Sequence, residues 1–457
     1  MRVSSLMQKL IVLLMSLAVL ATACGASDGD SGADVDVDTS ESASATETDD
    51  SSNAAAENDS GESDSAETDS AEPAEAAPAS VDLATCGFGD DLTADRIVVD
   101  QIPGDGRDST IPSALRDSFD PAFDPPLIDV NRVISGGPPP DGIPPVDAPV
   151  FQTASTVDWI NCNEPVLSLR VGDETRAYPV QILTWHELVN DTFGDVPVTV
   201  SYCPLCNSSL AYSRDFGDRI VTFGTSGRLF NSSLVMYDRE TESLWTHFNG
   251  QAVIGDLVGT QLELLPMQTT SWQSFLQANP DGLVLTRETG HDRAYGQNPY
   301  AGYDDVTTSP FLLDIDADPR LQAKQRIVGI RRGGDSAAVI LEAVQEAGVL
   351  ATDVGGDTLS IWHLPGTATA LEAQQITNGR DIGAIGVYLP VTTDGMALTF
   401  SRDGEVFVDA ETGSSWNIQG LATDGELAGT QLEPVEHLDT FWFALAAFEP
   451  DTRVVEA

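Results

Sequence analysis

The sequence predicts an α+β protein with two related domains in tandem. Each domain should consist mainly of antiparallel strands with short helices, and both should follow a disordered amino-terminal stalk. Three observations lead to this prediction. Short runs of alternating apolar and polar residues are separated by glycine-rich turns. One order of motifs occurs twice along the chain. Residues 28–80 are mainly Asp, Glu, Ser, Thr and Ala, with almost no large apolar side chain.

The amino terminus has the features of an export signal. Residues 1–23 combine a charged start with an uncharged apolar run, which is shorter than the roughly 20 residues that a membrane-spanning helix needs. The exit, Leu-Ala-Thr-Ala before Cys24, resembles the lipobox of bacterial lipoproteins, although alanine stands where leucine is usual. We expect removal of 1–23 and diacylation of Cys24, which would anchor the protein to the cell membrane from outside the cytoplasm. Ordinary secretion with a chance cysteine is the alternative.

Residues 24–84 comprise the lipidated cysteine and the acidic stalk. No Lys or Arg occurs between Lys9 and Arg96, and this composition cannot bury enough apolar surface to offset the entropy of ordering. The whole chain has 22 basic and 72 acidic residues, a formal net charge of −50. The stalk holds only part of this excess, so the folded region is itself acidic. This charge argues against nucleic acid or an anionic membrane surface as a direct partner, which leaves the lipid as the expected membrane contact.

The elements of the first domain follow from turn and periodicity signals. Residues 85–149, rich in Pro, Gly and Asp, predict an extended lead-in to a domain at 150–290. A hairpin is expected at 166–178 around a Gly-Asp-Glu turn. Apolar residues at helical spacing predict a short helix from Pro179 to about Asn190. Further strands are expected at 196–202, 209–213, 219–225 and 234–238, and a second helix at 272–279, capped by Ser271.

The second domain, residues 326–457, repeats the motifs of the first after a connecting segment at 291–325. Asp-x-Glu-Thr-x-Ser-x-Trp occurs at 238–245 and at 409–416, and Gly-Thr-Gln-Leu-Glu, Trp and Pro-Asp follow it in both places. The Cys-Pro-Leu-Cys of the first domain has no counterpart, because the matching position reads Leu364–Thr367, and His186 falls near Glu346. A residue needed only for folding should occur in both copies. The loss therefore favours a function confined to the first domain.

Cys203 and Cys206 mark the candidate site, in a turn between two strand-like runs. Two thiolates at this spacing suit zinc or copper, but one such turn supplies only two ligands. We expect His186 to be the third ligand. The fourth would be Met236, His247 or Glu187; methionine would favour copper, whereas a carboxylate or water would favour zinc.

Two other interpretations of the cysteine pair stay open. The pair can serve extracytoplasmic thiol–disulfide redox chemistry, although a strand-like run follows Cys206 where a thioredoxin-like motif has a long helix. Alternatively, the pair forms a structural disulfide in a non-catalytic binding or scaffold module, with His186 in the core. No phosphate-binding loop, serine nucleophile elbow or histidine-pair metalloprotease motif is present, so no reaction follows from the sequence.

The remaining polar candidates are less specific. Cys86 and Cys162 are left over after the other assignments, and in an exported protein we expect them to form a disulfide. A polar aromatic stretch, His291–Tyr303, either covers the site of the first domain or serves as a linker. Four polar side chains near the site either line a pocket or cap strands and turns: Arg228, Asn231, Tyr237 and Asp238.

Several longer motifs resemble the bacterial and archaeal family catalogued as domain of unknown function 3179. They are Trp185–Asp191, Val200–Ser208, Phe223–Asn231, Leu234–Trp245, Asn298–Tyr300 and Phe441–Ala444. The resemblance covers about 131–457 and implies no activity. It does imply Trp-His-Glu and Cys-Pro-x-Cys motifs, matched here at His186, Cys203 and Cys206. The usual glycine after the second cysteine is Asn207, which also tolerates a left-handed backbone.

Overall fold

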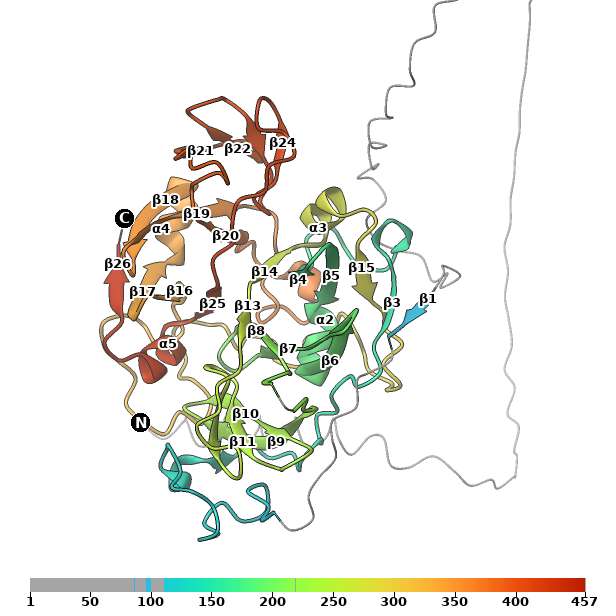
Figure 1. Ribbon diagram of the computed structural model, residues 1–457, viewed down its shortest axis with the longest axis vertical. Coiled ribbons are helices and arrows are strands. Elements are labelled where there is room, and N and C mark those ends of the chain that lie inside the picture. Colours follow the sequence, from blue (N-terminus) through green and yellow to red (C-terminus); the bar gives the residue numbers. More distant parts are fainter. Residues whose placement is uncertain (1–85, 87–95, 100–110, 218, 457) are drawn as a thin grey trace, which may run out of the picture. The chain divides into compact units, whose positions relative to one another are not determined.

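The computed structural model describes residues 86, 96–99, 111–217 and 219–456. The expected export signal, Cys24 and the stalk lie outside the described residues. The described chain consists mostly of antiparallel sheets with four short helices, as the sequence predicts (Figure 1). Within it, no helix has the length and apolar character needed to cross a membrane.

The first half of the fold, up to residue 290, contains three sheets. One has six strands, in the order β1 (Arg96–Val98), β3 (Val150–Thr153), β15 (Leu283–Leu285), β5 (Glu174–Pro179), β4 (Pro165–Val171) and β14 (Met267–Ser271). The second has four, in the order β13 (Leu264–Leu265), β8 (Ser208–Ser213), β7 (Val196–Cys203) and β6 (Leu188–Phe193). The third has five, in the order β12 (Gln251–Ile254), β11 (Leu244–Thr246), β10 (Ser233–Asp238), β9 (Phe223–Phe230) and β2 (Ile134–Ser135).

The second half, residues 326–456, repeats this plan with fewer strands. Its first sheet has the order β25 (His437–Phe441), β16 (Arg326–Arg332), β17 (Asp335–Ile340) and β26 (Arg453–Val455). The other two are β18 (Val349–Val354), β19 (Asp357–Leu364) and β20 (Ala384–Tyr388), and β21 (Phe400–Asp403), β22 (Val406–Asp409), β23 (Ser415–Trp416) and β24 (Ala422–Asp424). The order β14-β4-β5-β15 therefore recurs as β25-β16-β17-β26, including the parallel final pair.

The helices recur at matching places in the two halves. Each first hairpin leads into a seven-residue helix, and each last long strand leads into another: α2 (Val180–His186), α3 (Trp272–Ala278), α4 (Leu341–Ala347) and α5 (Trp442–Phe448). Short 3-10 turns occur at Val130–Arg132, Ala154–Thr156 and Ile376–Asn378. Ser271 caps α3 as expected, by accepting a hydrogen bond from the Ser274 amide.

Two element boundaries differ from the sequence prediction. The first helix ends at His186, not near Asn190, because Glu187 adopts a positive φ of 59° that no α-helix contains. Residues 188–193 then form β6, whose side chains are all buried, so their apolar spacing indicates a covered strand and not a helix face. The strand expected from Arg219 begins only at Phe223, because the preceding residues form a bridge between Asp215 and Ile220.

The two halves pack as one compact unit. One core cluster contains Cys203 and Trp245 of the first half together with Ile327 and Trp442 of the second. Because the two halves share a core, the structure does not test the boundaries expected for two domains, 150–290 and 326–457. These boundaries stay a prediction. The segment 111–149 lies along the first half, where Val146 forms a bridge with Val189. A disulfide joins Cys86 to Cys162, which is the pairing expected from the sequence.

The repeated Asp–Trp motif is a buried clamp. Asp238 accepts hydrogen bonds from the Thr241 amide, the Thr241 hydroxyl and Trp245 Nε1, the last at 2.9 Å. Asp409 makes the same bonds to Thr412 and Trp416, again with 2.9 Å to the indole nitrogen. Asp238 is fully buried, so its carboxylate fixes the turn between β10 and β11 from inside. The recurrence identifies a folding role for Asp238 instead of the pocket role considered from the sequence.

We expect Asp238→Ala to lower the free energy of unfolding by about 3 kcal/mol, because buried donors on Thr241 and Trp245 lose their acceptor. Urea unfolding followed by tryptophan fluorescence measures this loss. The exposed Asp403, at the end of β21, provides the control, and Asp403→Ala should change stability by less than about 0.5 kcal/mol. Equal effects of the two variants would contradict the clamp.

Candidate metal centre

Cys203 and Cys206 lie at the two ends of a tight turn in the core. Cys203 is the last residue of β7 and pairs with Ser208, the first residue of β8. The turn closes with a hydrogen bond from the Asn207 amide to the Pro204 carbonyl, and Asn207 has a φ of 50°. Asparagine therefore keeps the left-handed position that glycine usually fills, as expected. Cys203 is 1% exposed and Cys206 is fully buried.

His247 joins the two cysteines from a different sheet. It follows β11 directly, and its backbone is held by a hydrogen bond from its amide to Leu234 O and by one from the Tyr212 hydroxyl to its carbonyl. One ring nitrogen of His247 and the sulfurs of Cys203 and Cys206 all lie within 4.8 Å of one another. Of the His, Cys, Asp and Glu side chains that the structure describes, these three form the group able to hold a metal ion.

The His247 ring has unmet hydrogen-bonding capacity. The residue is fully buried, and neither Nδ1 nor Nε2 has a hydrogen-bond partner among the described residues. Burial lowers the pKa of His247 to about 4, so the ring is neutral and one nitrogen presents a lone pair. Leaving buried polar atoms unpaired costs roughly 1–3 kcal/mol each, and a metal bound at the lone pair would remove part of that cost.

The two thiols have different proton affinities. Burial raises the pKa of Cys203 well above its usual value, and the neighbouring Cys206 adds to this effect. Burial acts on Cys206 too, but hydrogen bonds from Cys203, Ser208 and Ser233 outweigh it and lower the pKa of Cys206. The Sγ of Cys206 lies 3.5 Å from Ser233 Oγ, and the Sγ of Cys203 accepts a hydrogen bond from the Leu234 amide at 3.4 Å. Cys206 is thus the first thiolate available to a cation.

His186 does not take the place that the sequence suggested. Its Nδ1 lies 2.6 Å from Pro144 O and its Nε2 lies 2.7 Å from the Tyr295 hydroxyl, so both ring nitrogens have other partners. The ring is outside the group of Cys203, Cys206 and His247. His247, proposed only as a fourth ligand, takes the third position instead.

Glu187 adjoins the centre and carries backbone strain. It is 6% exposed, has a φ of 59°, and its Oε1 accepts a hydrogen bond of 3.5 Å from the Tyr300 hydroxyl. The matching position at the end of α4 is Gly348, with a φ of 72°. An ordinary residue in this region costs about 1–2 kcal/mol, so the carboxyl is retained despite strain. Burial, reinforced by Cys203, raises the pKa of Glu187 to about 8.

The second half shows which residues occupy the positions equivalent to Cys203 and His247. Val349 pairs with Trp362 as Leu188 pairs with Ser201, so Leu364, the last residue of β19, corresponds to Cys203. The Tyr388 hydroxyl donates to Ile418 O as that of Tyr212 donates to His247 O, so Ile418 corresponds to His247. Both residues are buried in one core cluster. An apolar core therefore suffices for this fold, and the polar group of the first half needs another explanation.

The other residues considered from the sequence lie near the centre, and most of them hold neighbouring segments in place. Met236, on β10, is fully buried in the core cluster that contains both cysteines. The other side chains hold neighbouring segments: Arg228 donates to Leu115 O, Asn231 to Ala447 O, and Tyr237 to Asp141. The stretch His291–Tyr303 contacts the site region through Tyr295 and Tyr300. The mismatch between His247 and Ile418 is the sequence signal that points to the third member of the group.

Glu187 should make the stability of the metal-free protein depend on pH. Its pKa is raised from 4.5 to about 8 in the fold, so between these values the unfolded chain releases a proton that the folded chain keeps. Stability from this group is complete below pH 4.5 and falls by up to about 5 kcal/mol as pH rises to 8. Glu187→Gln should abolish this loss, so the variant gains stability relative to the parent across that window. A difference in unfolding free energy between the two proteins that stays the same at every pH would contradict this expectation.

Comparisons with known proteins give a family but no function. No curated protein and no solved structure matches the chain. The family described as protein of unknown function, DUF3179, matches residues 140–452, which include the cysteine turn, His247 and both halves of the fold. The chain therefore belongs to the DUF3179 family.

Proposed function

We propose that the protein is an extracytoplasmic lipoprotein that holds one zinc or copper ion at Cys203, Cys206 and His247. The observation that carries this proposal is the fully buried His247 ring, which has no hydrogen-bond partner in the described part of the chain and has a nitrogen within 4.8 Å of both sulfurs. The second half supports it, since leucine and isoleucine occupy the corresponding positions of Cys203 and His247. A metal ion explains why Cys203 and His247 replace apolar core residues there.

The charge of the donor set favours zinc over copper. Two thiolates and a neutral imidazole balance a divalent ion, whereas a monovalent copper ion would leave one negative charge in a dry interior. Zinc with two sulfurs and one nitrogen wants a fourth ligand. Met236 and Glu187 adjoin the group, and of these the carboxyl of Glu187 suits zinc and the thioether of Met236 suits copper.

Thiol–disulfide redox chemistry is the second candidate function. The lowered pKa of Cys206 favours it, because a thiolate is the reactive species. Exchange also needs access, and both sulfurs belong to residues at most 1% exposed, with strand β8 following the turn. The sulfurs are unbonded in the structure, which does not support the structural-disulfide alternative. The metal centre is therefore the better account.

Two features support export and lipid anchoring. The apolar run before Cys24 has the length and exit sequence of a lipoprotein signal. The disulfide between Cys86 and Cys162 suits an oxidising compartment outside the cytoplasm. We infer that the lipid is the contact with the membrane, because the net charge of −50 disfavours direct binding to anionic lipid or to nucleic acid.

Protein purified without an affinity metal should contain about one zinc or copper ion per chain. Elemental analysis combined with thiol titration measures this. His247→Gln should lose the metal, whereas the matched variant His186→Gln should keep it, because His186 already contacts Pro144 and Tyr295. Metal retained in His247→Gln and lost in His186→Gln would contradict the assignment. Metal-free protein with readily reversible thiol oxidation would support the redox alternative.

A variant that copies the second half separates metal loss from misfolding. Cys203→Leu combined with His247→Ile introduces the residues found at Leu364 and Ile418, which pack in the equivalent core. The double variant should stay folded and should bind no metal. Far-UV circular dichroism and elemental analysis on one sample test both parts. Stoichiometric metal in a folded double variant would rule out the proposed ligands.

Cys24→Ser should release the protein from the membrane fraction, because it removes the only cysteine expected to carry lipid. Fractionation of cells labelled with a radioactive fatty acid measures anchoring and lipidation together. Label and membrane association that persist in the variant would contradict lipidation of Cys24.

A further inference from the structure

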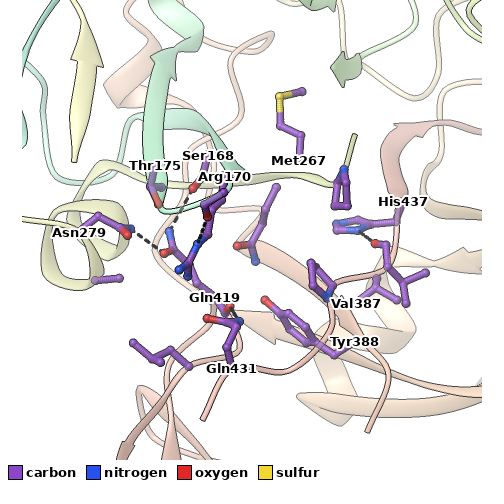
Figure 2. Close-up of a pocket in the computed structure, with 17 residues that line it drawn as sticks. Ser168, Arg170, Thr175, Met267, Asn279, Val387, Tyr388, Gln419, Gln431 and His437 are labelled. Carbon is purple, nitrogen blue, oxygen red and sulfur yellow. Dashed lines mark hydrogen bonds between the residues drawn. The ribbon is translucent and has the colours of Figure 1, made fainter. Parts of the chain in front are cut away.

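A cavity of about 300 Å³ lies where the two halves meet, away from the cysteine turn. Side chains from both halves face one another across it (Figure 2). Arg170 of β4 and Asn279 at the end of α3 come from the first half, and Tyr388 and Gln419 come from the second. None of its 17 lining residues is Asp or Glu, although 72 of the 457 residues in the chain are acidic. The lining of the cavity therefore lacks the acidic side chains that are in excess in the chain as a whole.

Arg170 is a cation without a carboxylate in this cavity. Arg170 is exposed, its Nε donates to Gly172 O at 3.2 Å, and it forms no ion pair with a carboxylate of the described residues. The other titratable side chains of the lining are Tyr388, whose hydroxyl donates to Ile418 O, and His437, whose pKa burial lowers and whose Nδ1 lies 2.9 Å from Val435 O. Arg170 thus supplies the only full charge facing the space among the lining residues.

The internal repeat provides a second copy of this corner, in which the corresponding arginine is paired. Arg331 pairs with Ser336 across its hairpin as Arg170 pairs with Thr175, so the two arginines correspond. Arg331 lies 3.7 Å from Glu449 Oε1 and donates to Phe248 O at 3.1 Å. Glu449 follows α5 as Asn279 follows α3. The first half therefore has an amide where the second has the carboxylate.

The paired copy is also filled by two phenyl rings that the cavity lacks. Phe248 and Phe448 stack there with centroids 4.7 Å apart and planes 11° apart. Phe448 is the last residue of α5, and its counterpart at the end of α3 is Ala278, which lines the cavity. In the first half, Phe248 and Asn249 lie between His247, whose carbonyl accepts from Tyr212, and Gly250. In the second half only Gln419 lies between Ile418, whose carbonyl accepts from Tyr388, and Gly420. The second turn is one residue shorter, so Phe248 has no counterpart.

The side-chain amides of Asn279 and Gln419 are hydrogen-bonded within the cavity wall. Asn279 Nδ2 donates to Gln419 Oε1 at 2.7 Å, and Gln419 Nε2 lies 3.4 Å from Ser168 Oγ. These bonds hold the wall in place without neutralising Arg170. The cavity is open to solvent, because Arg170, Gly172 and Pro434 of its lining are exposed, so a ligand can enter it. A concave site with a few placed polar groups is typical of small-molecule binding.

We propose that this cavity binds a small organic carboxylate with an aromatic or aliphatic body. The carboxylate occupies the place that Glu449 takes beside Arg331, and pairs with Arg170. The apolar body occupies the space that Phe248 and Phe448 fill in the other copy, against Tyr388 and Ala278. This proposal rests on the cavity and the repeat, and it is independent of the metal centre.

Isothermal titration of the full protein, with its metal content unchanged, tests the proposal with phenylacetate, 3-phenylpropionate and hexanoate. At least one should bind with a Kd of about 1 mM or below, which is the affinity expected for about ten heavy atoms. Benzyl alcohol and benzylamine match the body without the carboxylate and should bind at least about tenfold more weakly. Failure of all three carboxylates, or equal binding of the neutral and cationic probes, would overturn the proposal.

Variants copied from the other half give the sharper comparison. Asn279→Glu supplies Arg170 with the carboxylate found at Glu449, and Ala278→Phe restores a ring found at Phe448; each should weaken binding about tenfold or more. Arg170→Gln should do the same, and the control Arg331→Gln should leave affinity unchanged. Circular dichroism confirms that each variant is folded. Unchanged affinity in Asn279→Glu and Arg170→Gln would refute a carboxylate at this place.

Discussion

The turn after β11 depends on a hydrogen bond between a tyrosine hydroxyl and a backbone carbonyl. Tyr212 donates to His247 O at 3.0 Å, and Tyr388 donates to Ile418 O at 2.6 Å. Together with the Asp–Trp clamp, this bond places residue 247 in the core whatever its side chain is. In the second half the residue is isoleucine and the core is apolar. In the first half it is histidine, and the same backbone places an imidazole beside two sulfurs.

The same comparison of the halves explains both sites. A repeated fold uses equivalent backbone positions, so a difference between copies isolates what folding does not require. At the cysteine turn the first half has polar groups where the second has leucine and isoleucine. At the corner beside Arg170 the first half lacks the glutamate and the two rings that close the equivalent corner beside Arg331. One difference places three groups able to hold a metal ion in a core, and the other opens a cavity.

Much of the fold followed from the sequence because its signals are local. Alternation and turns predicted the hairpin of β4 and β5, Ser271 marked the start of α3, and the repeated motifs predicted the recurring strand order. The end of α2 did not follow, because a buried strand and a buried helix have similar apolar content. Left-handed backbone at Glu187, which decides between them, is unusual for a non-glycine residue.

The candidate metal centre could be predicted only in part, because its three residues come from two different sheets. Cys203 and Cys206 are joined by a short turn, so their proximity could be predicted from spacing. His247 reaches them through the pairing of β10 with β11, which depends on tertiary structure. The sequence favours His186, which has no counterpart in the second copy and belongs to a family motif, but its ring contacts Pro144 and Tyr295. The loss of histidine at Ile418 is the clue that the sequence contained.

X-ray absorption spectroscopy at the edge of the bound metal tests coordination by Cys203, Cys206 and His247. We expect two sulfur scatterers near about 2.3 Å and a nitrogen scatterer with imidazole features near about 2.0–2.1 Å. His247→Gln should remove the imidazole features or the metal itself. A coordination shell made only of oxygen and nitrogen, or protein that takes up neither zinc nor copper, would contradict a metal centre at Cys203, Cys206 and His247.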